Sequence, residues 1–168
     1  MKIMVLFLLT TCISIATYGQ KHPTKNWLSK KFKSADSILI ISHHRTKGHH
    51  ESDSTGKEIP IQELILNNKP NYSIVKERKL IKGQAIDSLI NILGRPSIRG
   101  NFALAGCFSP HHAIFIFSEA KTSYLNICFD CHREESSEDL FKLPNFDPKR
   151  WDELKAFYIN QGFTYRLK

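Results

Sequence analysis

The sequence has few acidic residues, few cysteines and no apolar run of membrane-spanning length. Its 168 residues include 24 Lys and Arg against 16 Asp and Glu, which gives a formal net charge of +8. A transmembrane helix needs roughly 20 consecutive apolar residues, and no stretch of the chain has them. Internal repeats and low-complexity tracts are also absent, which excludes solenoids, fibres and disordered chains. A hydrophobic content of 41% is enough for the core of one domain.

Two further absences limit the chemistry that the chain can perform. It contains no Gly-x-Ser-x-Gly or comparable nucleophile motif, so hydrolysis by a serine triad is not expected. The methionines are Met1 and Met4, so the rest of the chain has none that could serve as a distal haem ligand. No motif in the chain specifies a catalysed reaction.

Residues 1–19 are typical of a secretory signal peptide. Lys2 provides a basic start and a short apolar core follows it. Thr17 and Gly19 are the small residues that signal peptidase requires before a cut at Gln20. We therefore expect an exported protein, in the periplasm or outside the cell.

Cys12 offers an alternative route to the envelope, as the lipid attachment site of an outer-membrane lipoprotein. Thr11 is bulkier than the residue usual before a lipidated cysteine, so we place this route second. Cleavage after residue 19 leaves Cys107, Cys128 and Cys131 in a compartment that permits disulfides. An odd number of cysteines leaves one thiol over, or indicates a metal.

Positive charge is concentrated in the first part of the chain. Residues 20–100 contain 15 Lys and Arg against 7 Asp and Glu, whereas residues 101–168 contain 8 against 9. Residues 20–36 are interpreted as a basic N-terminal lead. The basic side chains are not interleaved with aromatic residues, so nucleic acid is not the expected partner. An envelope protein, an anionic lipid or a glycan surface stays open as a partner.

Apolar patterns predict the first secondary-structure elements. The β-branched run 37–42 predicts a strand, the polar stretch 43–59 predicts a loop, and 71–75 predicts a second strand. An amphipathic helix that ends at Gly94 is predicted by apolar residues at i, i+3, i+4 and i+7, namely Ile86, Leu89, Ile90 and Leu93.

A β-hairpin is the strongest pattern in the second half of the chain. Its strands are 113–117 and 124–129, and a short strand at 101–105 precedes them. The first strand of the hairpin is apolar on both faces, so we expect it in the middle of a sheet. The acidic stretch 134–139 predicts a loop.

A second helix is predicted near the C-terminus. Asp147 is the expected N-cap, and Phe146 can pack on Trp151 as a hydrophobic staple. Gly162 ends the helix, and the alternation in 163–167 predicts a closing strand.

These elements follow one another in the order β, β, α, β, β, α, β. That order favours an α+β fold, with a mostly antiparallel sheet and two amphipathic helices, in a single domain over 37–168. In the second helix we expect Trp151, Leu154 and Tyr158 to be buried, and truncation of Arg150 to have little effect.

The cysteines gather at one end of the predicted hairpin. A symmetric turn at 119–122 sets Ala113 opposite Cys128 and brings Cys107 near Cys131. We therefore expect a Cys107–Cys131 disulfide, with Cys128 as the buried spare thiol. Cys128 and Cys131 are an odd number of residues apart, so they can bond to each other only if the strand breaks between them.

Other interpretations of the same cysteines stay open. Cys128-x-x-Cys131-His132 has the spacing of c-type haem attachment. Redox catalysis by the CxxC pair would need a thiolate at a helix N-terminus, whereas acidic residues follow here. A Cys₃His zinc site would use the three cysteines and one nearby histidine, from the set Cys107, Cys128, Cys131, His111, His112 and His132. The expected cofactor is none, with zinc as the alternative.

The two segments that flank the hairpin carry a resemblance. The first is Cys107-Phe108-Ser109-Pro110-His111, and the return strand ends Ile127-Cys128-Phe129-Asp130-Cys131. This pattern resembles a group of uncharacterised exported envelope proteins of Bacteroidota, in which a Cys-aromatic-x-Pro stretch opens a hairpin that ends Ile-Cys-aromatic-x-Cys. The resemblance implies a small exported domain without an assigned activity.

A second, weaker metal candidate lies in the polar loop, where imidazoles could hold zinc, copper or nickel. It consists of His43, His44, His49 and His50. Solvated histidines on a polar loop are the alternative interpretation. From the sequence we expect an exported envelope domain with a structural or binding role and a disulfide-stapled hairpin. A metal-binding, redox or haem protein of the envelope is the alternative.

Overall fold

The computed structural model describes residues 23–48, 51–98, 106–119, 121–141 and 143–167. Among these residues, five antiparallel strands form one sheet in the order β6-β1-β7-β8-β9, and three α-helices accompany it, which confirms the predicted α+β class. The strands are β1 (Ser37–His43), β6 (Val75–Ile81), β7 (His112–Ser118), β8 (Lys121–Cys128) and β9 (Arg133–Ser136). The helices are α1 (Pro23–Lys33), α2 (Gln84–Leu93) and α3 (Pro148–Asn160).

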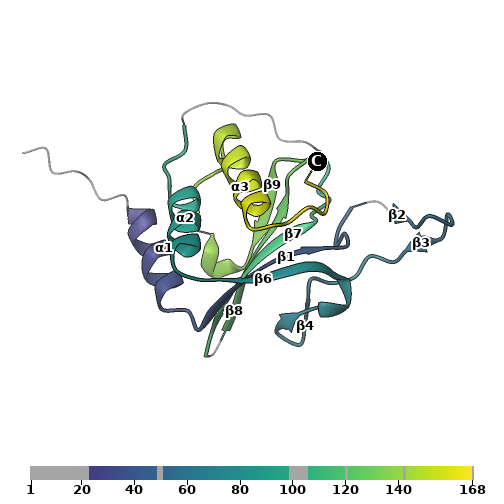
Figure 1. The fold of residues 1–168 in the computed structure, drawn as a ribbon, viewed down its shortest axis with the longest axis horizontal. Coiled ribbons are helices and arrows are strands. Elements are labelled where there is room, and N and C mark those ends of the chain that lie inside the picture. Colours follow the sequence, from purple (N-terminus) through teal and green to yellow (C-terminus); the bar gives the residue numbers. More distant parts are fainter. Residues whose placement is uncertain (1–22, 49–50, 99–105, 120, 142, 168) are drawn as a thin grey trace, which may run out of the picture.

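The helices cover one face of this sheet, and a small hairpin covers part of the other (Figure 1). That hairpin consists of β4 (Ile65–Leu66) and β5 (Lys69–Pro70), joined by Asn67 and Asn68. Both asparagines have positive φ values, of 51° and 60°, which suits a two-residue hairpin turn. The two faces of the sheet are called the helix face and the open face below.

Alternation along the strands divides the apolar side chains between the two faces. In β1, Ile38 and Ile40 belong to the helix-face core, whereas Leu39 and Ile41 belong to a separate cluster on the open face. β1 and β7 are therefore buried on both sides, which explains their continuous apolar runs. β7 lies between β1 and β8, so the expectation that the segment 113–117 is an interior strand is confirmed.

The two predicted helices are present with the expected ends. Gly94 is the C-cap of α2, and its N–H bonds to the Ile90 carbonyl. At the start of α3 the Asp147 side chain accepts a hydrogen bond from the Arg150 N–H at 2.8 Å. The rings of Phe146 and Trp151 lie 4.9 Å apart, centroid to centroid, which is the expected staple.

Three N-terminal expectations need correction. The basic lead 20–36 contains the helix α1, whose Leu28 and Phe32 join the core. The stretch 71–75 is mostly a 3₁₀ turn, Tyr72–Ile74, and the strand follows it as β6. We missed β6 because an edge strand keeps exposed charged residues that hide the apolar alternation.

Three loop and strand expectations also differ. The polar stretch 43–59 contains a short hairpin of β2 (Glu51–Ser52) and β3 (Glu58–Ile59), and 134–139 contains most of β9 and a 3₁₀ turn, Glu138–Leu140. Residues 163–167 are not a strand, because a turn follows α3, although Phe163 and Leu167 are buried.

The expectation that truncation of Arg150 has little effect also needs correction, because this side chain is fully buried. Its guanidinium donates to the carbonyl oxygens of Pro144 and Asn145 at 3.0 and 2.9 Å, and also to that of Arg95. Truncation of this side chain would remove a hydrogen-bond donor from each of these three backbone acceptors.

The predicted signal peptide 1–19, Cys12 and the predicted strand 101–105 lie outside the described residues. Within the described residues, none of the helices has the length and apolar character needed to cross a membrane.

Candidate functional site

A tight turn between β8 and β9 places two of the three cysteines in the described part of the chain together. β8 ends at Cys128, which pairs with Arg133 at the start of β9. Between them the chain reverses direction, and His132 takes the left-handed conformation with φ +49°. The turn brings the Cα atom of Cys131 to 5.3 Å from that of Cys128, and their sulfur atoms form a disulfide.

The expected Cys107–Cys131 pairing is therefore wrong for this structure. Cys128 and Cys131 can bond to each other only where the strand breaks between them, and β8 does end at Cys128. The register of the hairpin also differs, because Ala113 lies opposite Asn126 instead of Cys128. Because side chains alternate with a period of two, this two-residue shift leaves each side chain on its expected face. It does change which residues lie opposite each other at the end of the hairpin.

Cys107 keeps a free thiol close to this disulfide. Its sulfur lies 3.4 Å from the Cys131 sulfur, and its side chain is exposed. Cys128 and Cys131 are buried, with 2% and 3% of their surface exposed. The backbone N–H of Cys131 donates to the Cys128 sulfur at 3.2 Å.

Arg133 positions the segment that carries Cys107. Its Nη1 donates to the Cys107 carbonyl oxygen at 3.4 Å, and its guanidinium lies 5.5 Å from the centre of the Phe108 ring. A surface hollow of about 530 Å³ opens beside the thiol and is lined by Arg45, Gly48, Gly106, Cys107, Phe108 and Ser109.

The predicted histidine ligands do not join the sulfur atoms. His132 stacks on Trp151 with ring centroids 5.7 Å apart, and His112 Nε2 lies 3.0 Å from the Tyr165 carbonyl oxygen. His111 Nδ1 faces the His43 carbonyl oxygen at 3.3 Å. Among the described residues, no three His, Cys, Asp or Glu side chains are arranged to hold a metal ion. The haem interpretation needs two free thiols at Cys128 and Cys131, which are bonded to each other here.

The weaker metal candidate is divided in the structure. His43 lies in β1 and is fully buried, His44 follows it, and His49 and His50 lie outside the described residues. Burial lowers the pKa of His43 from 6.5 to about 4, so its imidazole is neutral at pH 7. Burial likewise lowers the pKa of His112 to about 3, and the nearby His43 adds to this.

His43 is part of a buried polar network with Asn126 and Thr46. His43 Nδ1 lies 2.6 Å from the His44 carbonyl oxygen and so donates to it. Its Nε2 lies 3.2 Å from the Asn126 side-chain oxygen, and Asn126 Nδ2 lies 3.1 Å from the Thr46 hydroxyl. Because neutral His43 donates from Nδ1, its Nε2 can only accept a hydrogen bond. Exchanging the positions of the Asn126 amide nitrogen and oxygen satisfies this, because the Asn126 NH₂ group then donates to His43 and the Thr46 hydroxyl donates to the Asn126 oxygen.

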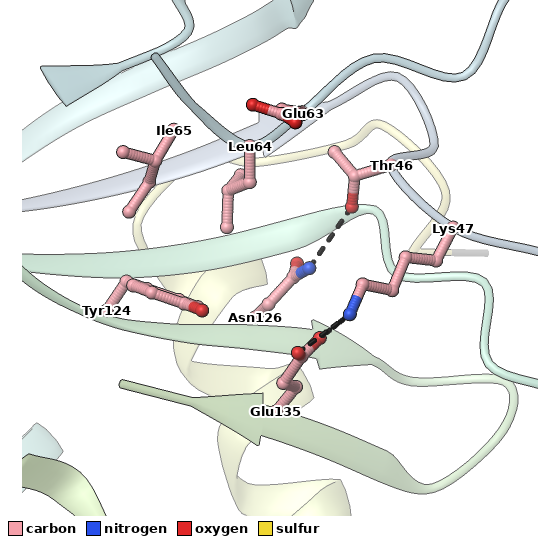
Figure 2. A pocket seen from close by; sticks show the side chains of 8 residues that line it. All are labelled: Thr46, Lys47, Glu63, Leu64, Ile65, Tyr124, Asn126 and Glu135. Atoms are coloured by element: carbon pink, nitrogen blue, oxygen red, sulfur yellow. Dashed lines mark hydrogen bonds and ion pairs between the residues drawn. The ribbon is translucent and has the colours of Figure 1, made fainter. Parts of the chain in front are cut away.

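Two members of this network, Asn126 and Thr46, line a pocket on the open face (Figure 2). Asn126 and Tyr124 come from β8 and Glu135 from β9, and the segments before and after β2 and β3 lie across from them. The pocket has a volume of about 230 Å³. It is lined by Thr46, Lys47, Glu63, Leu64, Ile65, Tyr124, Asn126 and Glu135.

Charged side chains meet at one end of the pocket. Lys47 Nζ donates to both Glu135 carboxylate oxygens, at 2.7 and 2.5 Å, and both side chains are partly exposed. Burial raises the pKa of Tyr124, and the Glu135 charge adds to the rise, so the phenol keeps its proton. The pocket thus presents an ammonium, a carboxylate, a phenol and an amide within a partly apolar wall.

No sequence pattern pointed to the polar residues of this pocket. The available signal was Asn126, a polar side chain within the apolar return strand of the hairpin. Most of the other lining residues, from Thr46 to Ile65, come from a long connection between β1 and β6, whose path across the sheet no local pattern indicates.

A comparison of the chain with protein-family models, curated proteins and solved structures finds no match.

Proposed function

We propose that the protein is an exported domain of the cell envelope that binds a small, hydroxyl-rich ligand, such as one sugar unit of an envelope glycan, in the open-face pocket. The observation that carries this proposal is the mixed lining of that pocket. Binding sites of this kind combine apolar walls with a few placed polar groups. No catalytic step is part of the proposal.

The individual groups suit hydroxyl groups on a ligand. Glu135 accepts hydrogen bonds, whereas Lys47 and the Tyr124 phenol donate them. Leu64 provides an apolar surface against which a ring can pack. A pocket of about 230 Å³ is smaller than the sites that hold drug-sized molecules, so a single ring is the appropriate ligand size.

Export is supported by the N-terminal pattern and by the resemblance to Bacteroidota envelope proteins. The basic start, apolar core and small residues before Gln20 match a signal peptide. The intact mass of the protein from the envelope tests this part. A chain that begins at Gln20 is expected, and a chain that begins at Cys12 with lipid mass identifies a lipoprotein instead. Retention of Met1 in a cytosolic fraction overturns the export proposal.

Ligand binding is tested by titrating the protein with a panel of monosaccharides and short envelope glycans, observed by NMR. We expect shifts of the Tyr124, Asn126 and Glu135 amide signals with one or more sugars. Glu135→Gln keeps the shape of the side chain but removes the acceptor charge, so affinity should fall about tenfold or more.

Glu138→Gln is the matched control, because Glu138 is an exposed glutamate of the neighbouring 3₁₀ turn and does not line the pocket. This variant should bind as the unaltered protein does. A panel with no effect on the pocket signals, or equal affinity in both variants, contradicts the proposal.

A further inference from the structure

Cys107, Cys128 and Cys131 form a cysteine cluster in which a free thiol contacts a disulfide. Cys131 occupies the shared position, because its sulfur is bonded to Cys128 and lies 3.4 Å from the Cys107 sulfur. We propose that this cluster is a thiol–disulfide exchange site in which Cys131 changes its partner between Cys128 and Cys107. This site is separate from the pocket and does not depend on the proposed function.

The distance between the sulfur atoms fits the start of the exchange. Reacting atoms about 3–3.5 Å apart are placed for attack, and the Cys107–Cys131 distance lies within that range. Arg133 holds the attacking segment in place by its bond to the Cys107 carbonyl and its contact with the Phe108 ring. Cys107 and Cys131 both lie outside the strands, so the new bond would join two loop residues.

The exchange step conserves atoms and electrons. The Cys107 thiol releases its proton to solvent, and the thiolate forms a bond to the Cys131 sulfur. The Cys128–Cys131 bond breaks, and Cys128 leaves with the electron pair as a thiolate, which then takes up a proton. One disulfide and one thiol are present before and after, so no external oxidant or reductant is required.

The leaving sulfur already has a hydrogen-bond donor. The Cys131 N–H points to the Cys128 sulfur at 3.2 Å, and hydrogen bonds from backbone N–H groups stabilise an anion. The contact therefore favours departure of Cys128, whose leaving tendency helps to set the rate of exchange.

The two forms differ in which thiol solvent can reach. With the Cys128–Cys131 bond, the free thiol is the exposed Cys107 beside the hollow. With the Cys107–Cys131 bond, the free thiol is Cys128, which has 2% of its surface exposed in the present structure. Exchange thus replaces an exposed thiol by a buried one without any change in the number of thiols.

Thiol labelling at a single residue distinguishes the two forms. The full chain with Cys12→Ser is incubated at pH 8 without reductant, quenched in acid, denatured and labelled with N-ethylmaleimide. Digestion before Asp130 separates Cys128 from Cys131, and mass spectrometry locates the label. We expect label on both Cys107 and Cys128, with the second fraction increasing during incubation to a plateau.

Cys107→Ser and Cys128→Ser are the matched variants. The first should keep the Cys128–Cys131 disulfide and take no label, whereas the second should form the Cys107–Cys131 disulfide and take no label. Label on Cys107 alone at all times in the three-cysteine chain overturns the proposal, and so does label on Cys131. The labelling of the three-cysteine chain decides the question even if a variant fails to fold.

Discussion

The helix face and the open face of the sheet use the same strands for different purposes. Among the described residues, the helix face buries 21 apolar side chains in one core, whereas the open face buries six in a separate cluster. The phenol of Tyr158, on the helix side, donates to the Ala113 carbonyl at 2.9 Å and ties α3 to β7. On the open face the apolar cluster borders a polar network and a pocket.

The difference indicates which face provides most of the stability and which face has room for the pocket to which we assign the proposed binding. Hydrophobic stabilisation grows with the apolar area removed from water, so the larger core contributes most of it. Polar groups cost less stability on the open face, because a short hairpin covers this face only in part. Four changes test this division, and the one with the smallest expected effect comes last.

Trp151→Ala should reduce the free energy of unfolding by about 3–5 kcal/mol, because it leaves a large cavity on the helix face. The side chain is 3% exposed and packs against Phe129, Phe146 and His132. Urea unfolding followed by circular dichroism measures the change. Lys149→Ala, an exposed position of the same helix, should alter stability by less than about 0.5 kcal/mol. Equal stability of both variants would mean that α3 does not anchor the core.

Lowering the pH should destabilise the protein through its buried histidines. The folded pKa of His43 is about 4 against 6.5 for an exposed imidazole, so the unfolded chain binds the proton first. The stability that neutral His43 contributes is complete above pH 6.5 and is lost as the pH falls toward 4, on the order of 3 kcal/mol. His112, with a pKa of about 3, extends the loss below pH 4.

Urea unfolding at pH 7, 5 and 4 measures this dependence, with His43→Gln as the comparison. The variant should show a smaller loss of stability between pH 7 and 4 than the unaltered protein. Asp139 and Asp147 act at lower pH: burial alone would raise the pKa of each, but hydrogen bonds from Lys31 and Arg95 hold both pKa values well below the usual range. An unchanged pH profile in His43→Gln would show that another group is responsible.

A matched pair of leucines compares the two faces directly. Leu154 is fully buried on the helix face, so Leu154→Ala should cost about 3–5 kcal/mol. Leu64 is 9% exposed and lines the pocket, so Leu64→Ala should cost about 1–2 kcal/mol, because solvent can fill the space. Thermal unfolding of the two variants gives the order. A larger loss for Leu64→Ala would reverse the assignment of the two faces.

Lys47→Ala should have the smallest effect on stability, about 0.2–1 kcal/mol. The Lys47–Glu135 pair is partly exposed, so solvent screens most of its attraction. Under the proposed function the same variant should weaken sugar binding, because it removes a hydrogen-bond donor from the pocket. A loss of stability above about 2 kcal/mol, measured by urea unfolding, would identify Lys47 as a structural residue.

Local patterns were sufficient for the central elements of the fold. The β-branched run of β1, the spacing of Leu89, Ile90 and Leu93 in α2 and the Asp147 cap of α3 each specify their element within a few residues. Edge strands were missed, because β6 and β9 are rich in charged residues and owe their conformation to pairing with a neighbour.

Local sequence patterns did not predict which residues the cysteines and the pocket side chains contact. The sequence by itself determined the α+β class, the interior strands and the two capped helices, because periodicity and capping depend on residues within one or two turns. Only the tertiary structure decided that Cys131 bonds to Cys128 with Cys107 beside it, and that Asn126 faces Thr46 and His43. These contacts depend on one turn between β8 and β9 and on the path of a long connection, and such features are set by packing across the whole sheet.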